Sequence, residues 1–142
     1  MRALAVAIIG LGLAISPRSL AMDDNFKVIV HPSNSITEID HNFLRDAYLK
    51  KAVVWPDGQP IRPVDLPSKV PARGRFTHEV LRKSDSQLKS YWSQQIFSGK
   101  GVPPQEADSI KSAIEIVVST AGAVGYVPFD AAVGEAKVIG IK

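Results

Sequence analysis

The sequence of 142 residues contains no cysteine. This absence excludes disulfide bonds, zinc–thiolate sites, a thiol nucleophile and a lipid-modified cysteine that would tether an exported protein to a membrane. The fold must therefore be held by burial of apolar surface, and a chain of this size can bury roughly two-thirds of its unfolded surface. With 45% hydrophobic and 22% charged residues, the composition is that of one folded domain rather than a disordered tail.

The sequence also lacks an N-terminal apolar run long enough to cross a membrane. Residues 3–15 are uncharged and apolar, but this run is about 13 residues long, whereas a membrane-spanning helix needs roughly 20. It follows the basic residue Arg2 and precedes the small residues of Ser19-Leu20-Ala21, which is the arrangement of a secretory signal peptide. We predict that residues 1–21 are cleaved and that residues 22–142 form one soluble periplasmic domain that does not span the membrane.

The predicted mature chain has nearly equal numbers of basic and acidic residues. Cleavage after Ala21 removes Arg2 and Arg18 and leaves 15 basic against 14 acidic residues. Binding to nucleic acid normally requires a concentrated basic face. We therefore expect no nucleic-acid partner.

Hydrophobic patterning indicates alternating strands and helices in a single mixed α/β domain. We expect strands at 26–30, 61–64, 123–127 and 137–141, and helices that begin at Asp40, Pro71, Ser84 and Asp108. Ser84 and Gln87 have the spacing of a capping box. Pro63 predicts an edge strand or an early strand end, because proline cannot donate to a sheet ladder.

Three aromatic residues attract attention as possible lining of a ligand groove. They are Trp55, Tyr91 and Trp92, and the last two share a helical stripe with Leu88 and Ile96. Aromatic side chains in such positions more often fill a core than a binding site. We expect them to pack inside.

Signatures of catalysis and metal binding are absent from the sequence. His31, His41 and His78 are far apart and do not have the i, i+4 spacing of a helical metal pair. No nucleophile-elbow motif occurs, and the acidic residues are scattered singly. We expect a protein that is not an enzyme and that has no cofactor and no metal site.

The segment 67–75 concentrates basic and hydroxyl groups at a predicted helix start. Ser68, Lys69, Arg73 and Arg75 lie there, and a helix start attracts anions through its free amides and dipole. Arginine can also hold phosphate or carboxylate by two parallel hydrogen bonds. These four residues form our candidate oxyanion site. The alternative is a solvated basic turn whose arginines pair with neighbouring acidic residues.

Several segments together resemble the phosphate-type periplasmic solute-binding proteins of ABC transporters, in a short version. The segments that carry the resemblance are 26–34, 43–51 with 55–58, 73–76, 91–92 with 97–99, and 122–127. The resemblance implies a type II periplasmic-binding-protein-like α/β fold, present as a single lobe with a mixed sheet flanked by helices. The family's Ser-Gly-Thr phosphate loop falls near residues 71–73 and is not reproduced.

The resemblance implies a non-catalytic periplasmic binding protein of the phosphate ABC transporter type. Its ligand would be inorganic phosphate or a related oxyanion, bound weakly, and its partner an ABC permease or another envelope protein. The alternative is a structural or protein-interaction module of the cell envelope that kept the lobe and lost the ligand.

Overall fold

A six-stranded mixed sheet organises the protein, and the computed structural model describes residues 24–142 of it. The predicted signal peptide lies outside the described residues. The strand order across the sheet is β2-β6-β1-β5-β3-β4. The elements along the chain are β1 (Phe26–Val30), β2 (Glu38–Ile39), α1 (His41–Tyr48), β3 (Arg62–Asp65), α2 (Pro71–Glu79), α3 (Asp85–Phe97), β4 (Gln105–Glu106), α4 (Ile110–Ser119), β5 (Ala123–Pro128) and β6 (Lys137–Ile141).

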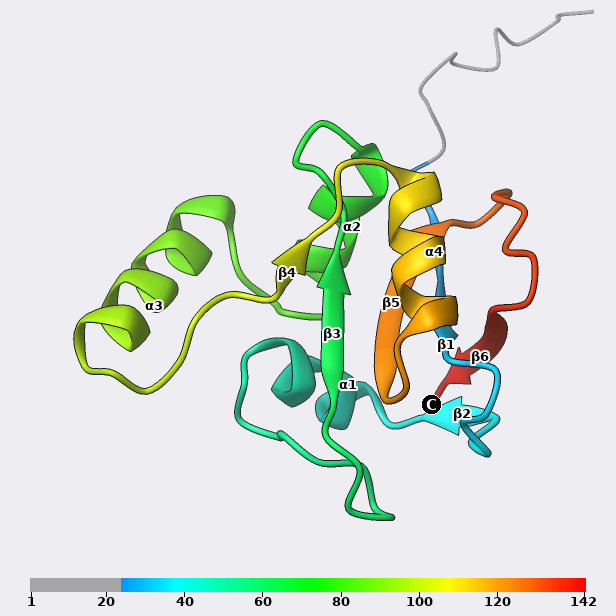
Figure 1. The fold of residues 1–142 in the computed structure, drawn as a ribbon. Coiled ribbons are helices and arrows are strands. Elements are labelled where there is room, and N and C mark those ends of the chain that lie inside the picture. The colour runs from blue at the N-terminus through cyan, green and yellow to red at the C-terminus, as the bar shows by residue number, and fades with distance from the viewer. Residues whose placement is uncertain (1–23) are drawn as a thin grey trace, which may run out of the picture.

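The direction of the strands makes the sheet mixed, as predicted. Strand β1 runs antiparallel to both of its neighbours, β5 and β6. Strand β3 runs parallel to β5 and β4, and β2 runs parallel to β6. Figure 1 shows α4 in front of this sheet and α1 and α2 behind it. The expected α/β class with helices on the sheet is confirmed.

Strand β5 packs against helices on both faces of the sheet. Gly125 faces α4 so closely that a Cβ atom there would lie 2.9 Å from Cγ2 of Val117. The next residue, Tyr126, points to the opposite face and stacks on Phe76 of α2 with ring centroids 3.8 Å apart. Because side chains alternate along a strand, small and large residues can follow one another and suit two different helices.

Local signals fixed most helix starts. The Asp40 side chain accepts hydrogen bonds from the amides of Asn42 and Phe43, and the capping box of Ser84 and Gln87 is formed. The prediction for the last helix was wrong by one residue, because Ser109 caps α4 in place of Asp108. Adjacent polar residues both suit a cap, and only the path of the chain selects between them.

Pro63 was expected to mark an edge strand or an early strand end. Strand β3 is not an outermost strand, since it lies between β5 and β4, but it does end early, two residues after Pro63. The Arg62 amide donates to the Gly122 carbonyl on the β5 side, 3.0 Å away, so the nitrogen of Pro63 faces the β4 side. Strand β4 begins opposite Val64 and therefore needs no donor from Pro63. The sheet tolerates proline here because the neighbouring strand is short.

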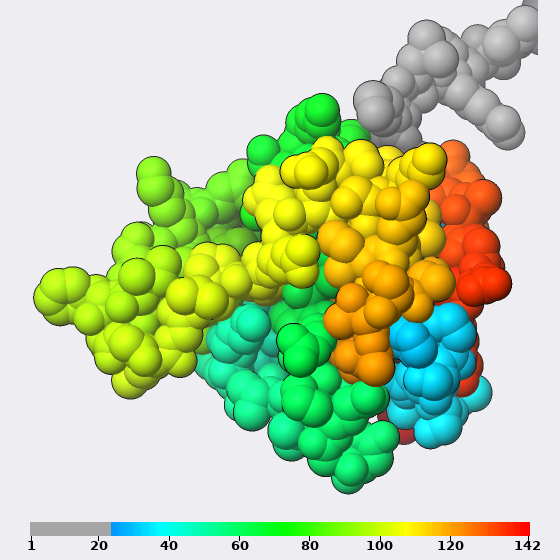
Figure 2. All heavy atoms as spheres, viewed as in Figure 1, coloured from blue at the N-terminus to red at the C-terminus, as the bar shows by residue number. Residues whose placement is uncertain are grey.

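Helix α3 projects from the sheet and forms an arm of the molecule (Figures 1 and 2). Trp92 is its one buried residue, at 8% exposure. Ile96, expected inside, is 54% exposed, and Phe97 at the end of the helix is 94% exposed. The arm is tied to the rest of the protein by the Tyr91 hydroxyl, which donates to the Leu49 carbonyl at 2.6 Å.

Within residues 24–142, no helix is both long enough and apolar enough to cross a lipid bilayer.

Candidate functional site

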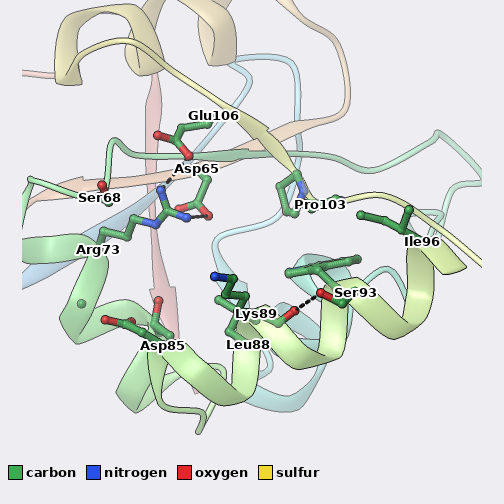
Figure 3. A pocket seen from close by; sticks show the side chains of 14 residues that line it. Asp65, Ser68, Arg73, Asp85, Leu88, Lys89, Ser93, Ile96, Pro103 and Glu106 are labelled. Atoms are coloured by element: carbon green, nitrogen blue, oxygen red, sulfur yellow. Dashed lines mark hydrogen bonds and ion pairs between the residues drawn. The ribbon is translucent and has the colours of Figure 1, made fainter.

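A pocket of about 530 Å³ opens between α2, α3 and the segment that runs through residues 103–106 into β4 (Figure 3). We call it the Arg73 pocket. Its lining residues are Asp65, Ser68, Arg73, Gly74, Thr77, Asp85, Leu88, Lys89, Trp92, Ser93, Ile96, Pro103, Pro104 and Glu106. The pocket therefore combines the end of β3, the first turns of α2 and one side of the arm.

The guanidinium of Arg73 is the centre of the charged end of this pocket. Its Nη1 donates to the Leu66 carbonyl and to Oε2 of Glu106, each at 2.8 Å. Its Nη2 lies 3.5 Å from Oδ2 of Asp65. Partial burial works against the charge of Arg73, but the two neighbouring carboxylates outweigh this effect and raise its pKa. The positive charge is thus largely compensated inside the protein.

Asp65 is the buried member of this group, with 13% of its side chain exposed. Its Oδ1 accepts hydrogen bonds from the Tyr126 hydroxyl and from the Leu66 amide. Burial raises the pKa of Asp65, although these hydrogen bonds and Arg73 oppose the shift. Burial, followed by the charge of Asp65, also raises the pKa of Tyr126. These hydrogen bonds join Asp65 to β5 and to the backbone that follows β3.

Glu106 differs from Asp65 because 53% of its side chain is exposed. It lies on the outermost strand of the sheet, β4, which has two residues. A carboxylate that is half in water can rotate away from Arg73 at small cost, whereas a buried one cannot. Of the two acidic partners, Glu106 is the replaceable one.

The other end of the pocket is apolar. Trp92 and Ile96 of α3 line it together with Pro103 and Pro104 of the segment before β4. Lys89 lies on α3 between the two ends (Figure 3). Within residues 24–142, no carboxylate lies within 4.0 Å of its ammonium group. The lining carries three acidic and two basic side chains, but Arg73 already engages two of the acids.

The four residues of the predicted oxyanion site do not converge. Ser68 and Arg73 line the Arg73 pocket, and Lys69 lines a separate hollow with Val70 and Asp130. Arg75 lines a third hollow, where it forms ion pairs of 2.8 Å with Asp24 and Glu79. Both arginines are paired with acids of this chain, which agrees with the alternative of a basic turn.

Sequence reasoning missed Asp65, Lys89 and Glu106 as members of the pocket. Asp65 had a usable signal, because it ends a strand three residues before Ser68. Glu106 lies 33 residues from Arg73 and had none. Trp92 was considered as a groove residue and expected to pack inside; it is 8% exposed and also lines the pocket, which depends on how the arm is placed.

The groups that line the pocket are able to bind a ligand. Across the described part of the chain, no group of three or more His, Asp and Glu side chains is placed to hold a metal ion. The pocket offers a guanidinium, an ammonium, hydroxyls of Ser68 and Ser93, and apolar walls. Such a set can hold a ligand by hydrogen bonds and contact without covalent change.

Comparison by sequence gives no relatives: no protein-family model matches the chain, and no curated protein matches it significantly. Comparison with solved structures does give matches. A phosphate ABC transporter substrate-binding protein from Clostridium perfringens, described as putative and solved with bound phosphate, matches with a TM-score of 0.65 and 18% identity. The match covers 82% of this chain and 44% of that protein.

The chain has the fold of one lobe of a type II periplasmic binding protein. PstS from Borrelia burgdorferi matches with a TM-score of 0.63 and 13% identity over 47% of its length. An ABC-type phosphate transport receptor from Vibrio cholerae matches with a TM-score of 0.59 and 16% identity over 45% of its length. The match therefore covers less than half the length of each of these proteins. The predicted resemblance to this family is confirmed at the level of the fold.

Proposed function

We propose that the chain is a non-catalytic periplasmic binding protein of the phosphate-receptor type, which binds inorganic phosphate or a related oxyanion weakly in the Arg73 pocket. One observation carries the proposal: Ser68 and Arg73 line a pocket at the start of α2, in the fold of proteins that include one solved with bound phosphate. Capture would occur by hydrogen bonds to the guanidinium and by attraction to the dipole of α2, with no covalent step.

The start of α2 suits an anion. Pro71 occupies its first turn and no side chain caps it, although the Arg73 amide already donates to the Val70 carbonyl at 3.0 Å and Ala72 lines the separate hollow with Lys69. The contribution of the helix start is therefore its dipole, which attracts negative charge at this end. Arg73 adds a guanidinium from the same turn, and Lys89 adds an ammonium from α3. An oxyanion would replace the exposed carboxylate of Glu106 on Nη1 of Arg73.

The affinity is expected to be low for two physical reasons. The charge of Arg73 is shared with Asp65 and Glu106, which compete with any anionic ligand. A single lobe also leaves one side of the anion in water, and tight oxyanion binding needs many converging donors in a dry site.

A second candidate function is that of an interaction module in the cell envelope, with an ABC permease or another envelope protein as partner. The observation that favours it is the arm, where Phe97, Ile96 and Val102 are 94%, 54% and 62% exposed. Large apolar side chains clustered in the sequence and left in water are typical of surfaces that bind other proteins. In this case the compensated Arg73 would be a structural ion pair.

Calorimetric titration of the purified protein with phosphate and with sulfate tests the first candidate. We expect saturable binding in the millimolar range that weakens with salt. Arg73→Gln should abolish it, and Arg75→Gln is the matched control because Arg75 lies on the same helix outside the pocket. Equal loss in both variants, or no binding by the unmodified protein, would favour the interaction module.

Export is tested separately. The protein recovered from the periplasmic fraction should begin at Met22, which N-terminal sequencing or intact mass would determine. A protein that retains residues 1–21 in the cytoplasm would contradict the periplasmic assignment.

A further inference from the structure

We propose that the Arg73 pocket takes an amphiphilic oxyanion, a ligand with one phosphate-like or carboxylate-like head and a compact apolar body. This inference rests on the proposed binding function and specifies its class of ligand. It places the head at Arg73 and the body against Trp92 and Ile96.

The size of the pocket is the first argument. Its volume of about 530 Å³ lies within the range of roughly 300 to 1,000 Å³ that is typical of sites for organic ligands. A bare tetrahedral oxyanion would occupy a small part of this space. The remaining space has to be filled by water or by another part of the same ligand.

The division of the lining is the second argument. At one end lie Arg73, Glu106 and Ser68, and at the other end lie Ile96 and Pro103 (Figure 3). Trp92, 8% exposed, belongs to the apolar end as well. Water held against such side chains is readily displaced by an apolar group, which gains affinity.

The placement of the charges favours an anionic head group. Asp65 and Glu106 are both engaged by Arg73, which leaves Lys89 and Asp85 as the charged lining residues without an ion pair among residues 24–142. Lys89 lies between Arg73 and the apolar end, whereas Asp85 lies away from the centre of the pocket (Figure 3). A cationic ligand would meet Arg73 and Lys89 at the centre of the pocket. An anionic head instead gains Lys89 and replaces the exposed Glu106 at Arg73.

The apolar body of the ligand would add binding free energy that the guanidinium, already paired with two carboxylates, cannot provide. Contact of a ring-sized group with Trp92 and Ile96 would remove on the order of 100 Å² of apolar surface from water, which corresponds to an affinity gain of about tenfold to a hundredfold. The preference for an amphiphilic anion over inorganic phosphate should therefore be large enough to measure.

Calorimetry with four probes separates head from body: inorganic phosphate, phenylphosphonate, benzyl alcohol and benzylammonium. Phenylphosphonate joins a ring to the head by a carbon–phosphorus bond, so it has no ester to hydrolyse. We expect it to bind at least about tenfold more tightly than phosphate, with no detectable binding of benzyl alcohol or benzylammonium at the same concentrations.

Two surface variants locate the apolar body. Ile96→Ser should weaken phenylphosphonate several-fold and leave phosphate unchanged. Val138→Ser is the matched control, because Val138 is an aliphatic residue of β6 with 48% exposure that does not line the pocket. Both residues are partly in water, so neither variant should lose its fold.

The outcomes distinguish this inference from the function on which it rests. Equal affinity for phosphate and phenylphosphonate would overturn the inference and leave phosphate binding in place. No binding of either anion would overturn both. Tighter binding of benzylammonium than of phenylphosphonate would overturn the anionic class, and equal effects of Ile96→Ser and Val138→Ser would overturn the position of the body.

Discussion

The sheet and the arm use the same kinds of side chain in opposite ways. Behind the sheet, Phe76 is 1% exposed, and its ring stacks on Tyr126 and meets Tyr48 edge-on with centroids 4.7 Å apart. On the arm, Phe97 is 94% exposed and belongs to no such cluster, and one residue of α3, Trp92, is buried.

This difference indicates that the sheet mainly provides stability, whereas the arm mainly contributes to the binding pocket. The sheet with α1, α2 and α4 holds nearly all of the buried apolar residues and therefore most of the folding energy. The arm adds one wall of the Arg73 pocket at little gain in stability. Ligand-binding elements are commonly drawn from such less stable parts of a protein. Four substitutions test how sharp the division is.

The largest effect is expected for Phe76→Ala. The substitution would leave a cavity beside Tyr48 and Tyr126, and deletion of a buried phenylalanine costs about 3 to 5 kcal/mol of the free energy of unfolding. Urea denaturation followed by circular dichroism measures it. A loss below about 1 kcal/mol would mean that the aromatic cluster is not the centre of the core.

Asp65 joins the core to the pocket, and Asp65→Asn tests how its ionisation affects the stability of the protein at different pH values. Burial raises the pKa of Asp65 in the folded protein, so the folded state holds the proton more tightly than the unfolded state. The stabilising contribution of this carboxyl is therefore complete at low pH and is lost as pH rises from about 4 through the folded pKa.

The measurement is the difference in unfolding free energy between the natural protein and Asp65→Asn, followed upward from about pH 4. This difference should fall as pH rises, because asparagine keeps the hydrogen bonds to Tyr126 and Leu66 without the buried charge. A difference that grows with pH would show that Arg73 stabilises the ionised carboxylate more than burial opposes it.

Glu106→Gln is expected to strengthen binding while leaving the fold intact. Glutamine can still accept from Arg73, but the competing charge is gone, so oxyanion affinity should rise by on the order of 1 kcal/mol, or about fivefold. Glu115→Gln on α4 is the control, since Glu115 is an exposed acid outside the pocket. Unchanged affinity would mean that Glu106 does not compete with the ligand.

The smallest effect is expected for Phe97→Ala, with a change in stability within about 0.5 kcal/mol because the ring is in water. Thermal unfolding monitored beside Phe76→Ala provides the comparison. A substantial loss would show that the arm is packed more firmly than its exposure indicates.

Much of the fold could be read from local patterns. The short apolar runs of 26–30 and 123–127, the cap at Asp40 and the capping box at Ser84 act over a few residues, so the sequence predicts them directly. The edge position expected for Pro63 was wrong because the cost of this proline depends on where the next strand begins. Ile96 was misjudged because helical spacing identifies a face of α3 but not how far that face is covered.

The candidate site was less predictable because most of its contacts join residues that are far apart in the sequence. Ser68 and Arg73 could be found because both lie at one helix start. Asp65 lies 61 residues before its partner Tyr126, and Glu106 lies 33 residues after Arg73. No local sequence pattern predicts contacts between residues so far apart. These contacts decide how much of the Arg73 charge is available to a ligand.

The sequence by itself determined the mixed α/β class, the absence of thiol chemistry and the basic helix start, because composition, periodicity and capping are local properties. The tertiary structure decided that Arg73 and Arg75 point into different hollows and are already paired with acids, and that α3 stands away from the sheet to form an apolar wall. Burial and ion pairing depend on distance in space, and that distance exists only once the chain has folded.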